Sequence, residues 1–300
     1  MMKVGVIMGG VSSEREVSLK SGRGILGSID KNKYEVVEVI LDSKQDIFEK
    51  AKGLDFALLA LHGEFGEDGT VQAILEAMDI PYSGCGPLTS GLCMDKNMSK
   101  KILKEGNIPT APWTTVKDLD KIDYDKIEEI GYPLFIKPNS GGSSVATFLI
   151  KDKSEIYDAV KEVLKYDKEA MIEKYIKGEE YTSFILNGEV FPTISIKTEN
   201  EFFDYEAKYS QDGKGAKEEV VYLDKDLQEK VNEVSKKCWD AFNCRVYVRV
   251  DVIISEGVPY VLELNTLPGM TATSLIPQSA KARGIEYSEL IDKIIEYSLA

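Results

Sequence analysis

Three residues near the end of the chain have types and a spacing that suit a divalent metal ion: Asp251, Glu263 and Asn265. They lie in or directly after two β-branched runs, residues 246–254 and 259–264, which predict a β-hairpin. Side chains alternate between the faces of a strand, so Val261 is expected to share a face with Glu263. Carboxylate and amide oxygens are donors that Mg²⁺ accepts, often together with the phosphates of a substrate. The pattern therefore indicates a nucleotide site.

The register of this hairpin decides which side chains face each other. If the turn has three residues, 256–258, Asp251 lies opposite Glu263. The same register places Arg249 opposite Asn265. Carboxylates that face each other repel, and one arginine cannot neutralise both, so we expect a metal ion there. The alternative for this motif alone is a solvated strand face with an incidental ion pair.

The composition limits the partners and the compartment. The chain has 300 residues, of which 43% are hydrophobic and 29% charged, and this length predicts two or three domains. The net charge of −14 argues against nucleic acid and anionic membranes as partners, because both are polyanions. The four cysteines have no C-x-x-C spacing, so we expect reduced thiols. We recognise no signal peptide and no apolar run long enough to span a membrane, so we expect a cytoplasmic protein.

Two glycine-containing loops in the first third of the chain follow apolar strands, which we predict at residues 3–8 and 56–61. In an open parallel sheet, ligands bind at the carboxyl ends of the strands, where both loops fall. Glu14 and His62 are therefore candidate ligand-binding residues. The alternative roles are structural, since an acid can complement a helix dipole and a histidine can hold a loop. Ser13 and Glu16 have the spacing of a capping box, which predicts the start of a helix.

A small-residue loop at 138–144 lies between two apolar runs that predict antiparallel strands. Backbone N–H groups of such a loop can bind phosphates, and Lys137 supplies a positive charge directly before it. The alternative is a flexible hairpin tip. A second polar, glycine-containing stretch, residues 203–217, has no periodicity and is expected to be a mobile loop.

Taken in order, these stretches resemble the D-alanine–D-alanine ligases of the ATP-grasp superfamily over essentially the whole chain. The motifs that carry the resemblance are GGVSSEREVSL (9–19), HGEFGEDG (62–69), KPNSGGSS (137–144), EAKY (206–209), RVDV (249–252) and ELNTLPGMTATSLIP (263–277). Each motif is modest, but six in this order are highly specific. The resemblance implies an α/β, in part α+β, ATP-grasp fold. Its parts are an N-terminal open parallel-sheet domain at 1–86, a central lid domain at 87–176 and a C-terminal catalytic domain at 177–300.

The family ligates two D-alanine molecules for peptidoglycan precursor synthesis, with ATP as the energy source. The resemblance implies that ATP phosphorylates the first D-alanine and that the amine of the second attacks this acyl phosphate. D-alanyl-D-alanine, ADP and phosphate are then released. It also implies a homodimer, two D-alanine subsites and the use of two Mg²⁺ or Mn²⁺ ions, held by Asp251, Glu263 and Asn265.

The resemblance also implies roles for particular residues of this chain. For ATP these are phosphate contacts from Lys96, Lys137 and Lys208, and adenine and ribose contacts from Glu173, Lys174, Ile176 and Glu180. For the oxyanion they are Arg249 and the N–H of Gly269. For the first D-alanine they are Glu14, Ser143, Tyr209 and His62, and for the carboxylate of the second they are Ser274 and the N–H of Leu275.

Two positions depart from the family pattern: Ala146 stands where glycine is common, and Val248 stands where small residues are usual. Their larger side chains are expected to affect loop closure or packing, and not the type of reaction. The alternatives are a ligase that makes D-Ala-D-Ser or D-Ala-D-lactate, the latter disfavoured by Tyr209, and a catalytically silent ATP-grasp binding protein. A nicotinamide-dependent dehydrogenase is disfavoured because the first glycine turn lacks the G-x-G-x-x-G motif.

Overall fold

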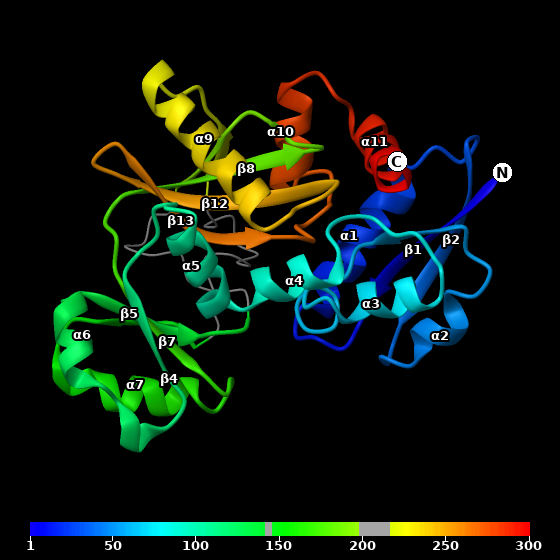
Figure 1. The fold of residues 1–300 in the computed structure, drawn as a ribbon. Coiled ribbons are helices and arrows are strands. Elements are labelled where there is room, and N and C mark those ends of the chain that lie inside the picture. Colours follow the sequence, from blue (N-terminus) through cyan, green and yellow to red (C-terminus); the bar gives the residue numbers. More distant parts are fainter. Residues whose placement is uncertain (142–145, 198–216) are drawn as a thin grey trace.

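The computed structural model describes residues 1–141, 146–197 and 217–300. Its three β-sheets follow one another along the chain, and helices pack against each of them (Figure 1). The first sheet is parallel, and the pairings within the other two are antiparallel. The predicted α/β class with α+β parts is therefore confirmed.

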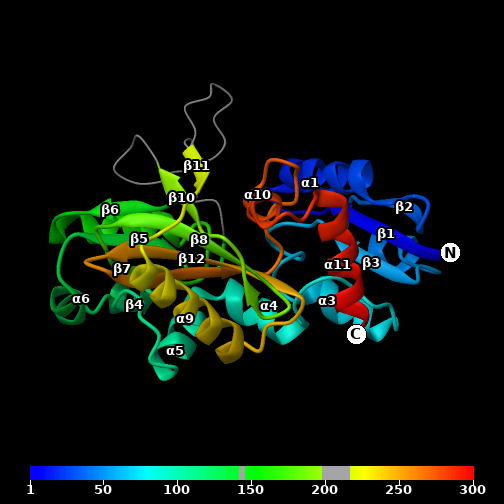
Figure 2. The ribbon, with the colours of Figure 1, turned by 90° about the horizontal axis from the view of Figure 1, so that it is seen from above.

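The first sheet has the strand order β2-β1-β3. Its strands are β1 (Met2–Gly9), β2 (Tyr34–Leu41) and β3 (Phe56–Leu59), and the helices between and after them are α1 (Arg15–Ser28), α2 (Asp46–Lys50) and α3 (Thr70–Ala77). All four residues of β3 are buried, as expected for a strand covered on both faces. Helix α11 (Tyr287–Leu299), from the other end of the chain, packs against α1, and both chain ends lie beside this sheet (Figure 2).

The second sheet has the strand order β4-β7-β5-β6. Its elements are β4 (Trp113–Val116), η1 (Leu119–Lys121), α6 (Tyr124–Ile130), β5 (Leu134–Pro138), β6 (Phe148–Ile150), η2 (Lys153–Glu155), α7 (Ile156–Val163) and β7 (Ala170–Lys174). Helix α7 covers the sheet with the buried stripe Ile156, Val160 and Val163, at the spacing of an amphipathic helix. Helices α4 (Pro87–Met94) and α5 (Lys96–Glu105) lead into this sheet from the first one.

The third sheet has the strand order β11-β10-β8-β12-β13, and β9 pairs with β8. Its elements are β8 (Glu179–Leu186), β9 (Glu189–Val190), β10 (Ile194–Lys197), β11 (Lys217–Val220), α9 (Lys225–Ala241), β12 (Tyr247–Ser255), β13 (Val258–Asn265) and α10 (Leu275–Ala282). Valines of β12 at alternate positions, 248, 250 and 252, are fully buried in one apolar cluster with Cys238 of α9. The opposite face of β12 is therefore available for polar groups.

The β12–β13 hairpin has the predicted carboxylate pairing, but its turn is shorter than predicted and one strand contains a bulge. Asp251 pairs with Glu263, whereas Ser255 pairs with Val258, so the turn has two residues and not three. Both turn residues have positive φ, which a two-residue hairpin turn of type I′ requires. The register shifts by one residue directly after Asp251, so a β-bulge compensates for the shorter turn.

The bulge also overturns the predicted face of Val261. Val252 pairs with Val261, and Val261 is buried in the same apolar cluster as Leu264. An extra residue in one strand reverses the alternation of side chains, so Val261 and Glu263 lie on opposite faces. The expectation that they share a face was therefore wrong.

The predicted capping box at the start of α1 does not form. The helix begins at Arg15, and no side chain caps it. Instead, the Ser12 hydroxyl accepts a hydrogen bond from the Glu14 N–H at 3.2 Å and donates one to the His62 carbonyl at 2.7 Å. Serine 12 is thus engaged with the loop after β3, and this contact fixes the two predicted ligand-binding loops side by side.

We expect the Gly69→Ala substitution to destabilise the protein by about 2 kcal/mol or more. Gly69 has φ +89° at the start of α3, and a Cβ atom there would overlap the Pro87 carbonyl oxygen. The measurement is the free energy of unfolding by urea. Gly27→Ala is the control, because Gly27 lies within α1 with nothing near an added Cβ, and this change should leave stability equal or slightly higher. Equal effects of the two substitutions would contradict the prediction.

Candidate active site

A buried ion pair lies at the centre of the polar face of β12. The Arg249 side chain donates two hydrogen bonds to Asp251, from Nε to Oδ1 at 2.9 Å and from Nη2 to Oδ2 at 2.7 Å. Thr182 of β8 donates to the same carboxylate at 2.5 Å, and Asn265 of β13 at 2.9 Å. Burial lowers the pKa of Arg249, but the Asp251 carboxylate outweighs it and raises the pKa above its ordinary value. The arginine is therefore a permanent, rigidly oriented cation.

The second carboxylate of the hairpin has a cation of its own. Glu263 lies opposite Asp251, and the Lys96 ammonium at the start of α5 is 3.8 Å from its Oε2 atom. Lys96 also donates to the Gly141 carbonyl, in the loop after β5. Burial lowers the pKa of Lys96, and the like charge of Lys137 adds to this effect. The two facing carboxylates are therefore each compensated by a side chain, which the sequence argument for a metal ion did not foresee.

A second charged cluster lies on the central sheet. Lys137 of β5 forms an ion pair with Glu173 of the neighbouring β7, and Lys100 of α5 forms another at 2.8 Å. Burial favours a higher pKa for Glu173, but the two lysines outweigh it and lower the pKa to about 2. The charge of Glu263 also acts on Lys137, so this cluster and the hairpin share one electrostatic environment.

The loops of the first sheet bring a third group of residues to the same region. A Cβ atom on Gly63 would lie 3.0 Å from the Glu14 carboxylate, so Glu14 lies directly against the loop at 62–69. In that loop, Glu67 accepts a hydrogen bond from the Gly63 N–H at 2.6 Å. Burial raises the pKa of Glu67 to about 8, with a further contribution from the negative charge of Glu14.

Glu67 also connects this corner to the hairpin. The charges of Arg249 and Glu263 both act on its pKa, the arginine lowering it and the glutamate raising it. The N-terminal loops therefore face the polar side of β12 and β13. Sequence reasoning missed Glu67, because the loop contains three acids and the sequence does not distinguish them. In the structure, Glu64 pairs with Lys44 at the surface, and Asp68 accepts the N–H groups of Phe65 and Thr70.

A buried serine of α1 ties His62 to the segment that follows β13. The Ser21 hydroxyl lies 3.1 Å from Nε2 of His62 and accepts a hydrogen bond from the Met270 N–H at 3.3 Å. Tyr287 of α11 donates to the Met270 carbonyl. One turn further on, the Ser274 hydroxyl accepts from the Thr271 N–H at 3.0 Å and lies against Gly269. Gly269 thus directly precedes the residue that Ser21 links to His62, and Ser274 and Leu275 lie at the N-terminus of α10.

The remaining predicted residues fall in three different situations. Glu180 lies on β8, where its charge acts on Lys137, and Ile176 lies between β7 and β8. The Lys174 ammonium donates to the carbonyls of Gly131 and Tyr132 at the end of α6, at 3.2 and 2.7 Å. Ser143, Lys208 and Tyr209, and most of the expected mobile loop, lie outside the described residues.

The two departures from the family pattern have different environments. Ala146 has φ +52°, in the left-handed region, where a residue other than glycine costs about 1–2 kcal/mol. This strain explains why glycine suits the position. Val248 is fully buried among the valines of β12, so its side chain faces the apolar cluster and not the polar site.

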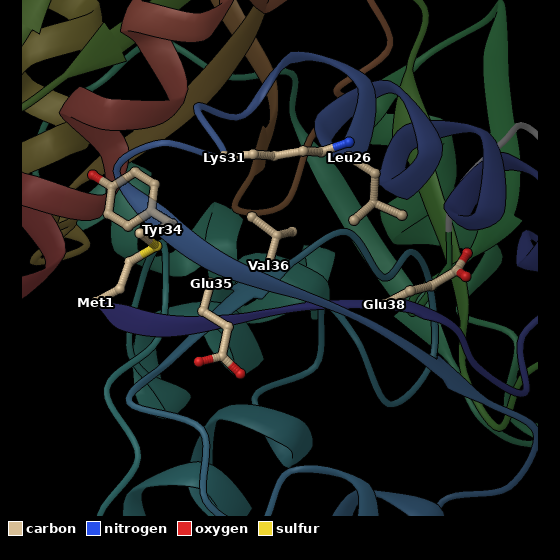
Figure 3. Close-up of a pocket in the computed structure, with 7 residues that line it drawn as sticks. All are labelled: Met1, Leu26, Lys31, Tyr34, Glu35, Val36 and Glu38. Atoms are coloured by element: carbon tan, nitrogen blue, oxygen red, sulfur yellow. The ribbon is translucent and has the colours of Figure 1, made fainter.

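Three further features of the described residues bear on other interpretations. In this part of the chain, no three His, Cys, Asp or Glu side chains are grouped as metal ligands, and the predicted set has two carboxylates and an amide. No helix that the structure describes is long and apolar enough to cross a membrane. A hollow beside the edge strand β2 contains none of the predicted site residues; its lining is Met1, Leu26, Lys31, Tyr34, Glu35, Val36 and Glu38 (Figure 3).

Comparisons with known proteins cover the whole chain. The family model described as D-ala D-ala ligase N-terminus matches residues 3–53 and 43–85, and the model described as D-ala D-ala ligase C-terminus matches residues 102–296. The chain is 63% identical to D-alanine--D-alanine ligase B of Clostridium perfringens, over 99% of this chain and 98% of the relative.

Solved structures agree with this match. The D-alanine--D-alanine ligase of Bacillus anthracis, complexed with ATP, is 48% identical with a TM-score of 0.90, over 100% of this chain and 98% of that chain. The VanG D-Ala:D-Ser ligase of Enterococcus faecalis is 27% identical with a TM-score of 0.85, over 99% of both chains.

We expect the Glu67→Gln variant to be more stable than the unmodified protein at alkaline pH and similar to it at acidic pH. The carboxyl has a pKa near 8 in the folded protein and 4.5 as its ordinary value, so the folded state binds the proton more tightly. Stability therefore falls as the pH rises from about 4.5 to about 8, and glutamine removes this loss while it still accepts the Gly63 N–H. The measurement is thermal unfolding in metal-free buffers across this range.

Glu64→Gln is the matched control for this experiment. Glu64 lies in the same loop, but its carboxylate pairs with Lys44 at the exposed surface. Its replacement should leave the pH dependence of the melting temperature unchanged. Parallel curves for Glu67→Gln and the unmodified protein would contradict the assignment of a raised pKa to Glu67.

Proposed function

This chain belongs to the D-alanine–D-alanine ligase family, and on that premise we propose that it joins two D-alanine molecules where the N-terminal loops face the β12–β13 hairpin. The reaction is an ATP-dependent, ADP-forming ligation. The γ-phosphoryl group passes to the carboxylate of the first D-alanine, and the amine of the second replaces the phosphate with loss of a proton. The family's place in peptidoglycan precursor synthesis is consistent with this activity.

The observation that carries the proposal is the meeting of cations and acids from all three sheets. Arg249 and Lys96 lie at the hairpin, Lys137 lies on the central sheet, and Glu14 lies in the N-terminal loops. A polyphosphate requires the cations, and the ammonium group of an amino acid requires an acid. The arrangement therefore suits a reaction between ATP and an amino acid.

Lys96 and Lys137 support the phosphate end of this proposal. Both ammonium groups are largely buried, and each is within contact of an acid on a neighbouring element, so their charges are held in place. Fixed cations stabilise the negative charge that develops on transferred phosphoryl groups.

The donor set also fits a divalent metal ion. Asp251, Glu263 and Asn265 meet on adjacent strands and offer carboxylate and amide oxygens, although Asp251 already accepts four hydrogen bonds from its neighbours. We propose that these three residues hold Mg²⁺ or Mn²⁺, which neutralises the phosphates when it is bound.

Arg249 and the segment from Gly269 to Leu275 support the acyl end. The guanidinium is fixed in its plane by two hydrogen bonds to Asp251, so it can act as a preorganised donor to a developing oxyanion. The helix α10 begins at Leu275, and its first N–H groups suit the carboxylate of the second D-alanine, together with the Ser274 hydroxyl. Two D-alanine subsites and a homodimer remain predictions from the resemblance, and a cytoplasmic location remains a prediction from the composition.

The test is phosphate release from Mg-ATP by the purified protein, followed by mass identification of the products. Separate reactions contain no amino acid, D-alanine, L-alanine, D-serine with D-alanine, or D-lactate with D-alanine. The proposal requires release that depends on D-alanine and yields D-alanyl-D-alanine. Mixed products only, with no dipeptide of D-alanine, would favour the D-Ala-D-Ser or D-Ala-D-lactate alternative, and ATP binding without any turnover would favour a silent binding protein.

We expect Glu263→Gln to lower the rate of ADP formation at least about tenfold and to raise the Mg²⁺ concentration required for half-maximal rate. The substitution keeps the size of the side chain but removes the charge that faces Asp251 and Lys96. The measurement is a Mg²⁺ titration of steady-state turnover.

Glu256→Gln is the control, because it makes the same charge change in the exposed turn of the same hairpin. Its turnover and Mg²⁺ dependence should equal those of the unmodified protein. An unchanged Mg²⁺ dependence in Glu263→Gln would rule out the metal assignment while leaving the ligase activity open to the product test.

A further inference from the structure

Lys100 is a buried lysine that the proposed ligation chemistry does not use. Its side chain is only 2% exposed, and it lies one helical turn after Lys96 on the same face of α5. Burial lowers its pKa, while the carboxylate of Glu173 acts in the opposite direction. A charge at such a depth is costly unless every donor has a partner, so its presence requires a reason.

The Lys100 ammonium has three oxygen neighbours, and they come from different parts of the fold. It donates to the Thr110 hydroxyl at 2.8 Å and to the Ala111 carbonyl at 3.1 Å. Its third contact is the ion pair at 2.8 Å with Oε2 of Glu173. Two hydrogen bonds and one ion pair therefore hold the ammonium in place.

Through these contacts Lys100 joins the central sheet to the third sheet. The Thr110 hydroxyl donates to the Val261 carbonyl at 2.9 Å, and the Val261 N–H donates to the Pro109 carbonyl at 2.8 Å. Val261 lies on β13, two residues before Glu263, and Glu173 lies on β7 of the central sheet. The lysine thus lies at the junction of the two sheets that supply the cations and acids of the site.

The cluster around Glu173 has an uneven charge because of Lys100. One carboxylate faces two ammonium groups, Lys100 at Oε2 and Lys137 at Oε1. Without Lys100, Glu173 and Lys137 would form a neutral pair, and the carboxylate would hold Lys137 more tightly. With Lys100 in place, one positive charge is left over in a buried region, where it acts strongly on a polyphosphate.

We propose that Lys100 is a positioning residue for ATP: it occupies one oxygen of Glu173 and thereby leaves the charge of Lys137 available to the phosphates. This inference rests on the proposed function, because it takes ATP as the ligand and Lys137 as a phosphate contact. It assigns no contact between Lys100 and substrate.

The experiment is calorimetric titration of Mg-ATP into the purified protein without D-alanine, together with steady-state measurement of the KM for D-alanine. We expect Lys100→Met to weaken ATP binding about tenfold, which corresponds to about 1.4 kcal/mol, and to change the D-alanine KM less than about twofold. Lys101→Met is the control, because the next residue of the same helix is exposed and should leave both quantities unchanged.

A second comparison separates this role from a packing role. In a Glu173→Gln background the carboxylate charge is absent, so the further change Lys100→Met should alter ATP affinity less than about twofold. This comparison also decides the matter if Lys100→Met alone does not fold, because the doubly substituted protein contains no unpaired buried acid. An equal loss of affinity in both backgrounds, or an unchanged affinity in Lys100→Met, would overturn the inference.

The same titrations distinguish a failure of the inference from a failure of the proposed function. ATP binding by the unmodified protein and an unaltered affinity in Lys100→Met would overturn the inference alone. No ATP binding by the unmodified protein would overturn the proposed function, and the inference with it.

Discussion

The polar site depends on one buried ion pair within a single strand. Arg249 and Asp251 lie two residues apart on the same face of β12, and their double hydrogen bond fixes the plane of the guanidinium. Thr182 and Asn265 also donate to Asp251, so the strands on both sides of β12 are tied to the same carboxylate. Buried ion pairs contribute little net stability, because desolvation offsets their attraction. Their effect here is orientation, which a site for charged substrates requires.

The alignment of the hairpin with this pair depends on a bulge. A two-residue turn alone would place Asp251 opposite Leu262, and the Glu263 side chain would point to the apolar face. The bulge after Asp251 restores the pairing with Glu263, while the two-residue turn alone already places Val261 opposite Val252 in the core. From the sequence, the pairing could be predicted because of the polar residues, but the turn length and the bulge could not. A three-residue turn and a two-residue turn with a bulge contain the same number of residues, and only the backbone geometry at Glu256 and Gly257 distinguishes them.

The parts of the fold that local pattern determines were the parts that could be predicted. Apolar runs and glycine turns indicated the strands of the first sheet, the antiparallel pair around the 138–144 loop and the amphipathic helices. Lys100 and Glu67 could not be found in this way. Lys100 is one of several lysines on α5, and only its burial against Thr110 and Glu173 distinguishes it from the others. Thr110 follows α5 in the chain, and Glu173 lies on β7 of the central sheet. The contact of Ser12 with His62 in the loop after β3 is likewise tertiary, and the predicted capping box of Ser13 and Glu16 does not form beside it.

The packing of α11 against α1 has a consequence for how the molecule is made. Leu290, Ile291, Ile294 and Ile295 of α11 are almost fully buried in the same cluster as Leu19 and Ile25 of α1. Ribosomes deliver the N-terminal end of a chain first, and domains generally fold as they emerge. Here α1 emerges long before α11, so the apolar face of α1 that α11 covers stays open to water until α11 is synthesised. The nascent chain must therefore keep this surface from aggregating while the other two sheets are still being translated.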